Sequence, residues 1–331
     1  MQRATRIQRR QVIGALCWAA LGLGVLTVVL RQIASLDAIV FAPIAGCAVV
    51  GVFVLARRWG DWGILVAYVV SMGFFIQLRD AADETGLRIL TSYVLDWELW
   101  MFAGVTPSAW LQSRIGGAES APGLPAYFSA IVHWTWFVFP HAAVIGTWLF
   151  VRRMAWRVTI IVALTFYLGV ILYFTVPTAP PWMAAEQGLI NDVVRGMHSV
   201  GPAILGVDFY NWAFEAMAEP NPSAAMPSLH FAASFVVVGV GIVLRSRWLI
   251  SVALLYSAAL TFALVYLGEH YIADIIAGGA VAAFAFGAVE GGRFVRYWLQ
   301  RRSAELEERW VRVANWLREA LRLPPMRIPT S

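Results

Sequence analysis

The sequence predicts an all-α, polytopic membrane protein with about eight transmembrane helices. Of its 331 residues, 60% are hydrophobic and only 14% are charged. The hydrophobic residues are also concentrated in long runs that carry no charge. A water-soluble fold could not bury this much apolar surface, so the runs indicate helices that cross a bilayer.

Eight segments are long and apolar enough to span the roughly 30 Å hydrocarbon core of a bilayer as helices. They are residues 12–30, 38–56, 62–78, 124–150, 157–176, 228–244, 248–267 and 270–290. The first follows a basic N-terminus, as the apolar part of a signal peptide does. It is long enough to span the bilayer, however, and no small-residue cleavage pattern ends it, so we interpret it as a membrane helix.

The basic residues indicate how these helices are oriented. All of them are arginines, and short cytoplasmic loops carry an excess of basic residues. With both termini in the cytoplasm, the arginine clusters fall on the cytoplasmic side: Arg3, Arg6, Arg9, Arg10, Arg57, Arg58, Arg152, Arg153, Arg157, Arg245, Arg247, Arg293 and Arg296. We therefore expect an integral protein of the cell membrane. The charge balance is only mildly basic and no domain face gathers the arginines, so no nucleic-acid partner is expected.

Two long loops, residues 79–123 and 177–227, are predicted on the extracytoplasmic side. They contain most of the acidic residues: Asp80, Asp83, Glu84, Asp96, Glu98, Glu119, Glu186, Asp192, Asp208, Glu215 and Glu219. Loops of this length are usually functional or carry short helices of their own. The tryptophan-rich segment LTSYVLDWELWMFAG, residues 90–104, predicts a helix in the membrane interface.

The region after the last span predicts an amphipathic helix. Tryptophans and leucines recur there near helical spacing, with arginines and glutamates between them. Such a helix is expected to lie on the anionic inner leaflet of the membrane. The final segment PPMRIPTS, residues 324–331, is expected to be disordered.

Five histidines fall in or near the outer half of the predicted membrane region, where an ionisable group is costly and indicates function by default. His133 and His141 are eight residues apart on one face of the fourth span. Hydrogen bonds to neighbouring helices explain these two more simply than catalysis does. His198 follows Arg195 by three residues, and it is equally compatible with a solvated residue and with a substrate site.

The segment MPSLH, residues 226–230, predicts a phosphate site at the start of a helix. Pro227 suits the first turn, where its missing N–H is no loss, and Ser228 and His230 follow in that turn. The unpaired backbone N–H groups and the positive end of the helix dipole then favour a bound phosphate. His230 would stand beside that phosphate.

The segment EHYIAD, residues 269–274, predicts a nucleophile with its supporting acid. His270 and Asp274 are four residues apart, and so on one face at the outer start of the eighth span. A carboxylate there can hold the imidazole in one tautomer and raise its basicity. A second histidine at another helix start on the same membrane side makes the combination more specific than either motif alone.

A metal site is the competing interpretation, because two histidines and an aspartate could hold zinc or iron. Against it, a Pro-Ser turn that opens a helix builds an anion site, and Asp274 is better spaced to support His270 than to bind a metal beside it. Cys17 and Cys47 lie within apolar runs and give no disulfide or metal pattern. We therefore expect no metal and no cofactor.

These two motifs resemble those of the type 2 phosphatidic acid phosphatase superfamily, in which a Pro-Ser-x-His element opens one helix and a His-x-x-x-Asp element opens another. The resemblance implies a six-helix catalytic core at residues 61–291, preceded by two additional helices at 1–60 and followed by the amphipathic helix and tail at 292–331. It implies that His270 forms a phosphohistidine, that Asp274 is its partner and that His230 protonates the leaving oxygen. It also implies that Ser228 and the backbone around it, including Pro227, cradle the phosphate.

The chain departs from the phosphatases of that superfamily in its basic residues. They have a Lys and Arg-Pro element before the first histidine motif and an arginine six residues before the nucleophile, where this chain has Leu264. The segment PTAPPWM, residues 177–183, and GVTPSAWLQ, residues 104–112, instead resemble the inositol phosphorylceramide synthase branch. Phosphoryl transfer needs positive charge. The candidates on the outer side are Arg195 and Arg114, followed by His198 and Arg88.

The sequence thus predicts a membrane enzyme that transfers a phosphoryl group from a phospholipid or polyprenyl phosphate to a lipid or alcohol acceptor, with its site on the extracytoplasmic face. A hydrolytic lipid phosphatase is the first alternative. A non-catalytic lipid-binding or transport protein is the second. The lipids involved and the oligomeric state have no motif that identifies them.

Overall fold

A computed structural model describes residues 2–34, 37–116, 122–191, 193–217 and 224–320. Three of the acidic loop residues, Glu119, Asp192 and Glu219, lie outside these ranges, as does the tail predicted to be disordered. The described residues are helical and contain no β-strand, so the prediction of an all-α fold is confirmed.

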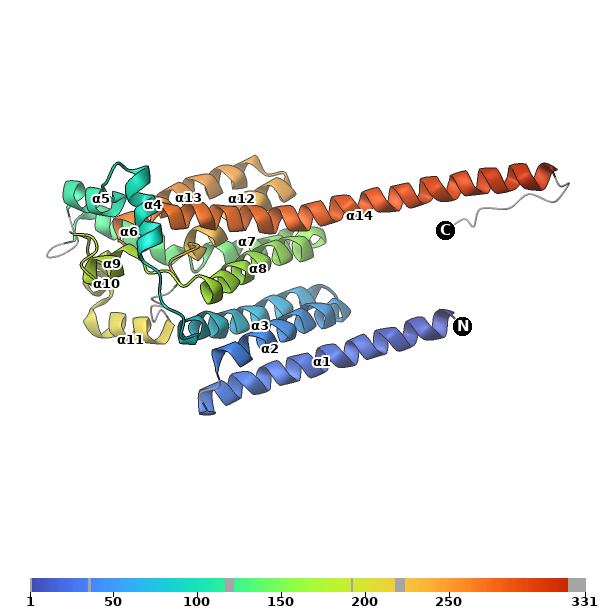
Figure 1. The fold of residues 1–331 in the computed structure, drawn as a ribbon, viewed down its shortest axis with the longest axis horizontal. Coiled ribbons are helices and arrows are strands. Elements are labelled where there is room, and N and C mark those ends of the chain that lie inside the picture. The colour runs from blue at the N-terminus through green and yellow to red at the C-terminus, as the bar shows by residue number, and fades with distance from the viewer. Residues whose placement is uncertain (1, 35–36, 117–121, 192, 218–223, 321–331) are drawn as a thin grey trace. The chain divides into compact units, whose positions relative to one another are not determined.

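The helices follow one another along the chain with short connections (Figure 1). Their bounds are α1 Gln2–Ala34, α2 Ala38–Ala56, α3 Gly60–Ala81, α4 Ser92–Met101, α5 Pro107–Ile115, α6 Leu124–Thr135, α7 Phe139–Phe150, α8 Arg152–Thr175, α9 Pro181–Glu186, α10 Gly196–Leu205, α11 Val207–Met217, α12 Leu229–Leu244, α13 Arg247–Tyr266 and α14 Ile272–Ala320.

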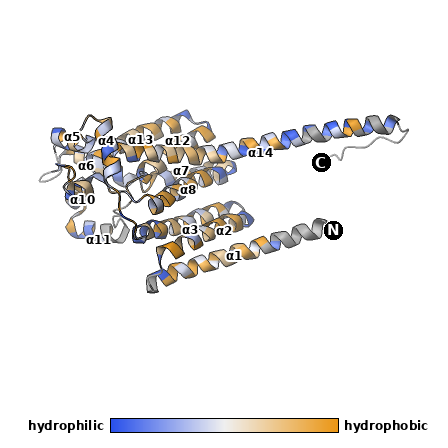
Figure 2. Ribbon diagram, in the orientation of Figure 1, coloured by the Kyte–Doolittle hydropathy of each residue, from blue (hydrophilic) through white to orange (hydrophobic). Residues whose placement is uncertain are grey.

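Apolar residues predominate on the long helices of residues 1–285, whereas the C-terminal half of α14 carries many hydrophilic residues (Figure 2). Within the described ranges, five helical segments are long and apolar enough to cross a membrane, or six if the bent pair α6 and α7 is one span. One of the five, Ala38–Glu84, contains both α2 and α3, and α12 has only 16 residues. The protein is therefore an integral membrane protein, while the number of eight spans and the orientation of the termini stay predictions.

The single helix predicted over residues 124–150 is wrong. The chain forms two helices there, α6 and α7, which are bent by 44° at a break between Thr135 and Phe139. Pro140 explains the break, because it has no N–H to donate to the carbonyl of Trp136 and its ring clashes with a continuous helix. The break turns Trp136 toward the cavity described below.

The short helices α4, α5, α9, α10 and α11 gather at the end of the bundle where α13 finishes and α14 begins (Figure 1). Backbone hydrogen bonds around Thr178 join the two long loop regions. The N–H of Ala179 donates to the carbonyl of Leu90 at 3.0 Å, and the N–H of Ala225 donates to that of Thr178 at 3.1 Å. Segments from both predicted outer loops are thus joined beside the motif that opens α12.

The chain divides into two compact units, residues 1–285 and 286–331. Helix α14 runs through this boundary without a break, so the residues predicted to form a separate amphipathic helix are a continuation of α14. In the second unit, pairs one helical turn apart, Arg301 with Glu305 and Glu308 with Arg312, line the helix surface, and Trp298 and Trp310 are exposed. The candidate site lies wholly in the first unit.

Candidate active site

His230 lies in the first turn of α12. Ser228 is the N-cap of this helix, and its Oγ accepts the N–H of Phe231 at 3.3 Å, which satisfies one of the donors left over at a helix start. The prediction that Pro227 occupies the first turn is wrong, since Pro227 precedes the cap. Its carbonyl accepts a hydrogen bond from the hydroxyl of Tyr173 at 3.1 Å.

His270 lies in the tight connection between α13 and α14. Gly268 makes this turn possible because it has a φ of +73° and because a Cβ there would lie 2.9 Å from the carbonyl oxygen of Val194. The N–H groups of Glu269 and His270 both donate to the carbonyl of Leu264, at 3.0 and 3.3 Å. Helix α14 starts at Ile272, two residues after His270, so His270 stands just outside the helix that was predicted to contain it.

Close backbone contact aligns α12 with α14. The N–H of Ser228 donates to the carbonyl of Asp274 at 3.0 Å. A Cβ on Gly278 would lie only 2.4 Å from the carbonyl oxygen of Ser228, so the absence of a side chain at Gly278 permits this approach. The two motifs that are forty residues apart in the sequence are therefore joined through their main chains.

The two histidines are hydrogen-bonded to each other. His230 Nδ1 lies 2.9 Å from His270 Nε2, and His270 Nδ1 lies 3.4 Å from Asp274 Oδ2. Because a carboxylate only accepts, His270 carries its hydrogen on Nδ1, and its Nε2 presents a lone pair toward His230. Asp274 is fully buried, and its Oδ2 also accepts the N–H of Tyr271 at 2.9 Å.

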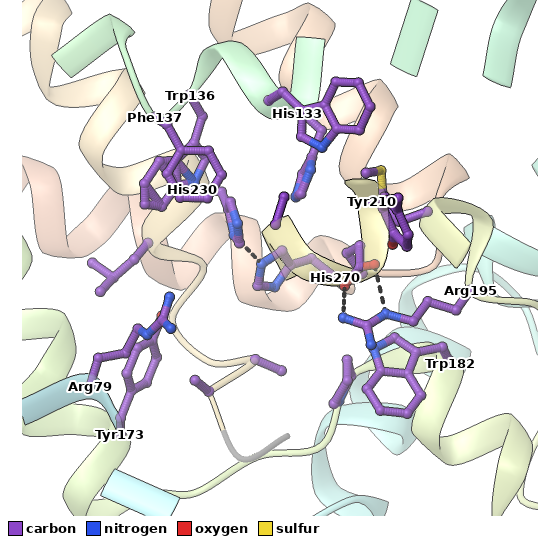
Figure 3. Close-up of a pocket in the computed structure, with 18 of the residues that line it drawn as sticks. Arg79, His133, Trp136, Phe137, Tyr173, Trp182, Arg195, Tyr210, His230 and His270 are labelled. Carbon is purple, nitrogen blue, oxygen red and sulfur yellow. Dashed lines mark hydrogen bonds and ion pairs between the residues drawn. The ribbon is translucent and has the colours of Figure 1, made fainter. Parts of the chain in front are cut away.

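Both histidines line a cavity of about 460 Å³ (Figure 3). Eight of the 21 described residues that line it are Phe, Tyr or Trp, and they come from α3, α6, the α6–α7 turn, α8, α9 and α11. Two arginines also line it, and Figure 3 shows Arg79 on one side of the histidine pair and Arg195 on the other. The cavity therefore offers apolar walls and positive charge around a nucleophilic nitrogen, a combination that suits an amphiphilic phosphate.

Arg195 is held by three neighbours at the cavity wall. Its guanidinium forms a two-armed ion pair with Glu269, at 3.0 and 3.3 Å, and it lies 4.5 Å from the ring centre of Trp182. Burial would raise the pKa of Glu269, but the charge and hydrogen bonds of Arg195 outweigh burial and hold this pKa below its ordinary value. Arg195 Nη1 also donates to His198 Nε2 at 3.0 Å. Burial and the charge of Arg195 lower the pKa of His198, which keeps that ring neutral and able to accept.

The other predicted phosphate-binding residues are arranged differently. Ser228 is fully buried as the cap of α12, and neither it nor Pro227 lines the cavity. Arg114 is exposed at the end of α5, and Arg88 is exposed before α4; neither lines the cavity. His198 contacts Arg195 from outside the cavity wall. Among the cations proposed from the sequence, Arg195 therefore shares the cavity with His230 and His270, and the others do not.

Two basic residues of the cavity wall were not selected as site residues from the sequence. Arg79, at the end of α3, was passed over in favour of other outer arginines, although its spacing of four from Phe75 puts both on one face and both line the cavity. His133 was interpreted as a structural histidine. Its ring lies 4.9 Å from that of His230, and neither of its nitrogens has a hydrogen-bond partner among the described residues, so the hydrogen bond expected for it is not found there. The same interpretation is confirmed for His141, whose Nδ1 lies 2.6 Å from the hydroxyl of Tyr68.

The metal alternative finds no support in this geometry. In the parts of the chain that the structure describes, no group of three His, Cys, Asp or Glu side chains is arranged to hold a metal ion. His230 and His270 point their nitrogens at each other, and Asp274 lies behind His270. The three side chains form a line rather than a cage.

Comparison with known proteins identifies the family. A model of the PAP2 superfamily matches residues 91–288, which is more than half of the chain and includes His230, His270 and Asp274. The chain belongs to the PAP2 superfamily. The predicted resemblance is thereby confirmed, and this PAP2 protein is a membrane protein of a family of phosphatases and phosphotransferases. Arg79 and the first three helices lie outside the matched residues.

A curated relative extends the comparison. The PAP2 protein is 28% identical over 132 residues to the phosphoinositol dihydroceramide synthase of Bacteroides thetaiotaomicron. The similar region covers 38% of this chain and 43% of that relative, so less than half of the relative is matched. No solved structure matches this chain.

Proposed function

We propose that this PAP2 protein is a membrane-embedded phosphoryl-transfer enzyme that acts on lipid phosphates or phospholipid head groups through a phosphohistidine and transfers to an alcohol or lipid acceptor. One observation carries the proposal. His270 Nε2 faces His230 at 2.9 Å, Asp274 engages the other nitrogen of His270, and the pair opens on a cavity with two arginines.

In the first step, His270 Nε2 attacks the phosphorus of the donor. A P–N bond forms and the P–O bond to the leaving alcohol breaks, while His230 in its protonated form gives a proton to the leaving oxygen. Asp274 stabilises the positive charge that develops on the His270 ring. The hydrogen bond between the two histidines must open during this step, because phosphorus has to take the place that His230 Nδ1 now holds.

In the second step, the oxygen of the acceptor attacks the phosphorus of the phosphohistidine. The P–N bond breaks, a new P–O bond forms, and the acceptor proton passes to His230, which returns to its starting state. The residue six positions before His270 is Leu264, fully buried and apolar where a phosphatase of the superfamily has an arginine. The name of the Bacteroides relative, a phosphoinositol dihydroceramide synthase, also favours transfer to a lipid hydroxyl over hydrolysis.

Arg79 and Arg195 supply the positive charge that a transferring phosphoryl group needs. Both arginines line the cavity from opposite sides of the histidine pair (Figure 3). Glu269 neutralises much of the charge of Arg195 and fixes the direction of its guanidinium. Arg79 likewise pairs with Asp80 at 3.2 Å, so each of the two cavity arginines has a carboxylate neighbour. The arginine distribution along the chain supports an extracytoplasmic location of the site.

Turnover by the purified protein tests this function. Phosphatidylinositol, phosphatidic acid and a polyprenyl diphosphate, each labelled with radioactive phosphorus, are incubated with a lipid alcohol and either the natural protein or His270→Ala. His141→Gln is the matched control, since His141 is a histidine of α7 that does not line the cavity. A new labelled phospholipid that contains the lipid alcohol, and whose formation depends on His270, supports the transferase.

The remaining outcomes separate the alternatives. Release of free phosphate or of a free phosphorylated head group, again dependent on His270, would identify a hydrolase instead. If no substrate gives a product that His270→Ala abolishes, both enzymatic functions fail and a non-catalytic lipid-binding protein is left.

A further inference from the structure

Helix α14 takes the acceptors for its first two N–H groups from another part of the chain. The residue before its first turn is Tyr271, whose side chain has no acceptor suited to the free N–H groups of a helix start. The N–H groups of Ile272 and Ala273 nevertheless have partners. They donate to the two carboxylate oxygens of Glu98, Oε1 at 3.1 Å and Oε2 at 3.3 Å.

Glu98 comes from a distant part of the chain and is fully buried. It lies on α4, and no part of its side chain is exposed. Its neighbour Asp96 on the same helix is exposed to solvent. A carboxylate is rarely buried unless its oxygens are engaged, and here both oxygens are engaged by the first turn of the helix that carries Asp274.

Glu98 and Asp274 together bind three successive amides. Asp274 Oδ2 takes the N–H of Tyr271, and Glu98 takes the next two. The same Asp274 oxygen faces His270 Nδ1 at 3.4 Å. The direction of the Asp274 carboxylate therefore depends on the first turn of α14, which Glu98 holds from outside.

We propose that Glu98 is a positioning residue of the active site, which fixes the first turn of α14 so that Asp274 stays aligned with His270. This inference rests on the proposed function, in which His270 is the nucleophile. Glu98 does not line the cavity, so it acts through Asp274 and not on the substrate.

The geometry calls for a carboxylate at this position. An ionised carboxylate offers an acceptor to each of two N–H groups and is favoured by the positive end of the helix dipole. A glutamine has one acceptor oxygen, and its NH2 group would face the second N–H. Glutamine at position 98 therefore keeps the size of the side chain and removes half of the cap.

The protonation of Glu98 gives this role a measurable signature. The titratable groups that face it are Asp274 on α14 and Tyr271, the residue before α14. Burial raises the pKa of Glu98 to about 7, against the opposing effect of its two backbone hydrogen bonds. As the pH falls through about 7, Glu98 gains a proton and one of its two oxygens becomes a poor acceptor, so turnover is expected to fall on the acid side.

The test compares Glu98→Gln with Asp96→Asn, which alters the neighbouring exposed carboxylate. We expect Glu98→Gln to lower kcat at neutral pH by about 10- to 100-fold, the cost of a small misplacement of a catalytic group, with little change in KM for the labelled lipid donor. Its kcat should also lose the acid-side fall that Glu98 causes. Asp96→Asn should keep the natural kcat and pH profile.

A second variant and a second measurement complete the test. Glu98→Asp keeps the charge on a shorter side chain, so it should lower kcat by less than Glu98→Gln and retain the acid-side fall; it decides the question if Glu98→Gln cannot be purified folded. Hydrogen exchange over residues 268–276 reports the cap without requiring turnover, and Glu98→Gln should accelerate it.

Different results would overturn the role of Glu98 and the proposed function of the protein. If Glu98→Gln and Glu98→Asp both match Asp96→Asn in kcat, pH profile and exchange, or if they raise KM at constant kcat, Glu98 is not a positioning residue. If the natural protein shows no His270-dependent turnover, the proposed function fails, while the exchange experiment still decides whether Glu98 holds the first turn of α14.

Discussion

His230 Nδ1 lies 2.9 Å from His270 Nε2, so the nitrogen assigned to attack phosphorus is engaged by the residue assigned to protonate the leaving group. A substrate that enters between them receives the attack and the proton from opposite sides. This arrangement gives the two histidines separate, measurable contributions to the rate.

Replacing His230 by glutamine should lower turnover of a natural lipid donor by about 100- to 10,000-fold, because general acid catalysis contributes that much. The loss should shrink for a donor with a p-nitrophenolate leaving group, which departs without a proton. His270→Gln should abolish turnover of both donors, since the nucleophile is gone. An equal loss on both donors in His230→Gln would contradict the role of His230 as the acid.

Replacing Arg79 by glutamine should lower kcat/KM for the lipid phosphate by roughly 100-fold, as expected when one group that stabilises the transferring phosphoryl is removed. Arg88→Gln is the matched control, because Arg88 is an exposed arginine of the same loop region that does not line the cavity. Steady-state kinetics with both variants checks the assignment. Similar kcat/KM values in the two variants would show that Arg79 does not stabilise the transferring phosphoryl group.

The buried ion pair between Arg195 and Glu269 should dominate the acid stability of the protein. Their side chains are only 14% and 11% exposed, so Glu269→Gln takes the carboxylate partner from a buried guanidinium and should cost about 3 kcal/mol in the free energy of unfolding. Asp61→Asn, which breaks a pair whose side chains are 56% and 57% exposed, should cost less than about 1 kcal/mol.

The pH dependence of that pair has a defined sign. Arg195 holds the pKa of Glu269 below its ordinary value of 4.5, so the stabilisation is complete above about pH 4.5 and is lost as the pH falls through the lowered pKa. Thermal unfolding in detergent, followed from neutral to acid pH, should therefore show a smaller acid-side loss in Glu269→Gln than in the natural protein. An unchanged acid limb would show that other carboxylates control it.

Adding a methyl group to Gly278 should separate the two catalytic helices. Its Cβ would lie 2.4 Å from the main-chain oxygen of Ser228, which cannot move aside as a flexible side chain can. We expect Gly278→Ala to cost about 1 to 3 kcal/mol of stability and to lower kcat. Gly287→Ala, whose Cβ meets nothing within 4 Å on the same helix, should change stability by less than about 1 kcal/mol and leave kcat unaltered.

Much of the fold could be predicted because a bilayer constrains each segment that crosses it. A span has to be a long apolar helix, and that can be recognised segment by segment. Prediction failed at residues 124–150, where hydropathy does not register that Pro140 breaks the helix, and at the start of α14, where the helix begins two residues later than expected. Hydropathy indicates whether a segment lies in lipid or in water, whereas the ends of a helix depend on individual hydrogen bonds.

The sequence by itself determined the family and the pairing of His230, His270 and Asp274, because those side chains stand at helix starts in two short motifs that can be recognised locally. Only the tertiary structure decided the surroundings of that trio. Arg79 and His133 enter the cavity wall, Arg114 lies outside it, and Glu98 reaches the start of α14 from a helix 174 residues earlier in the chain. The physical reason is that a cavity and a cap are made by side chains from distant segments, whose meeting depends on how the helices pack and leaves no pattern along the chain.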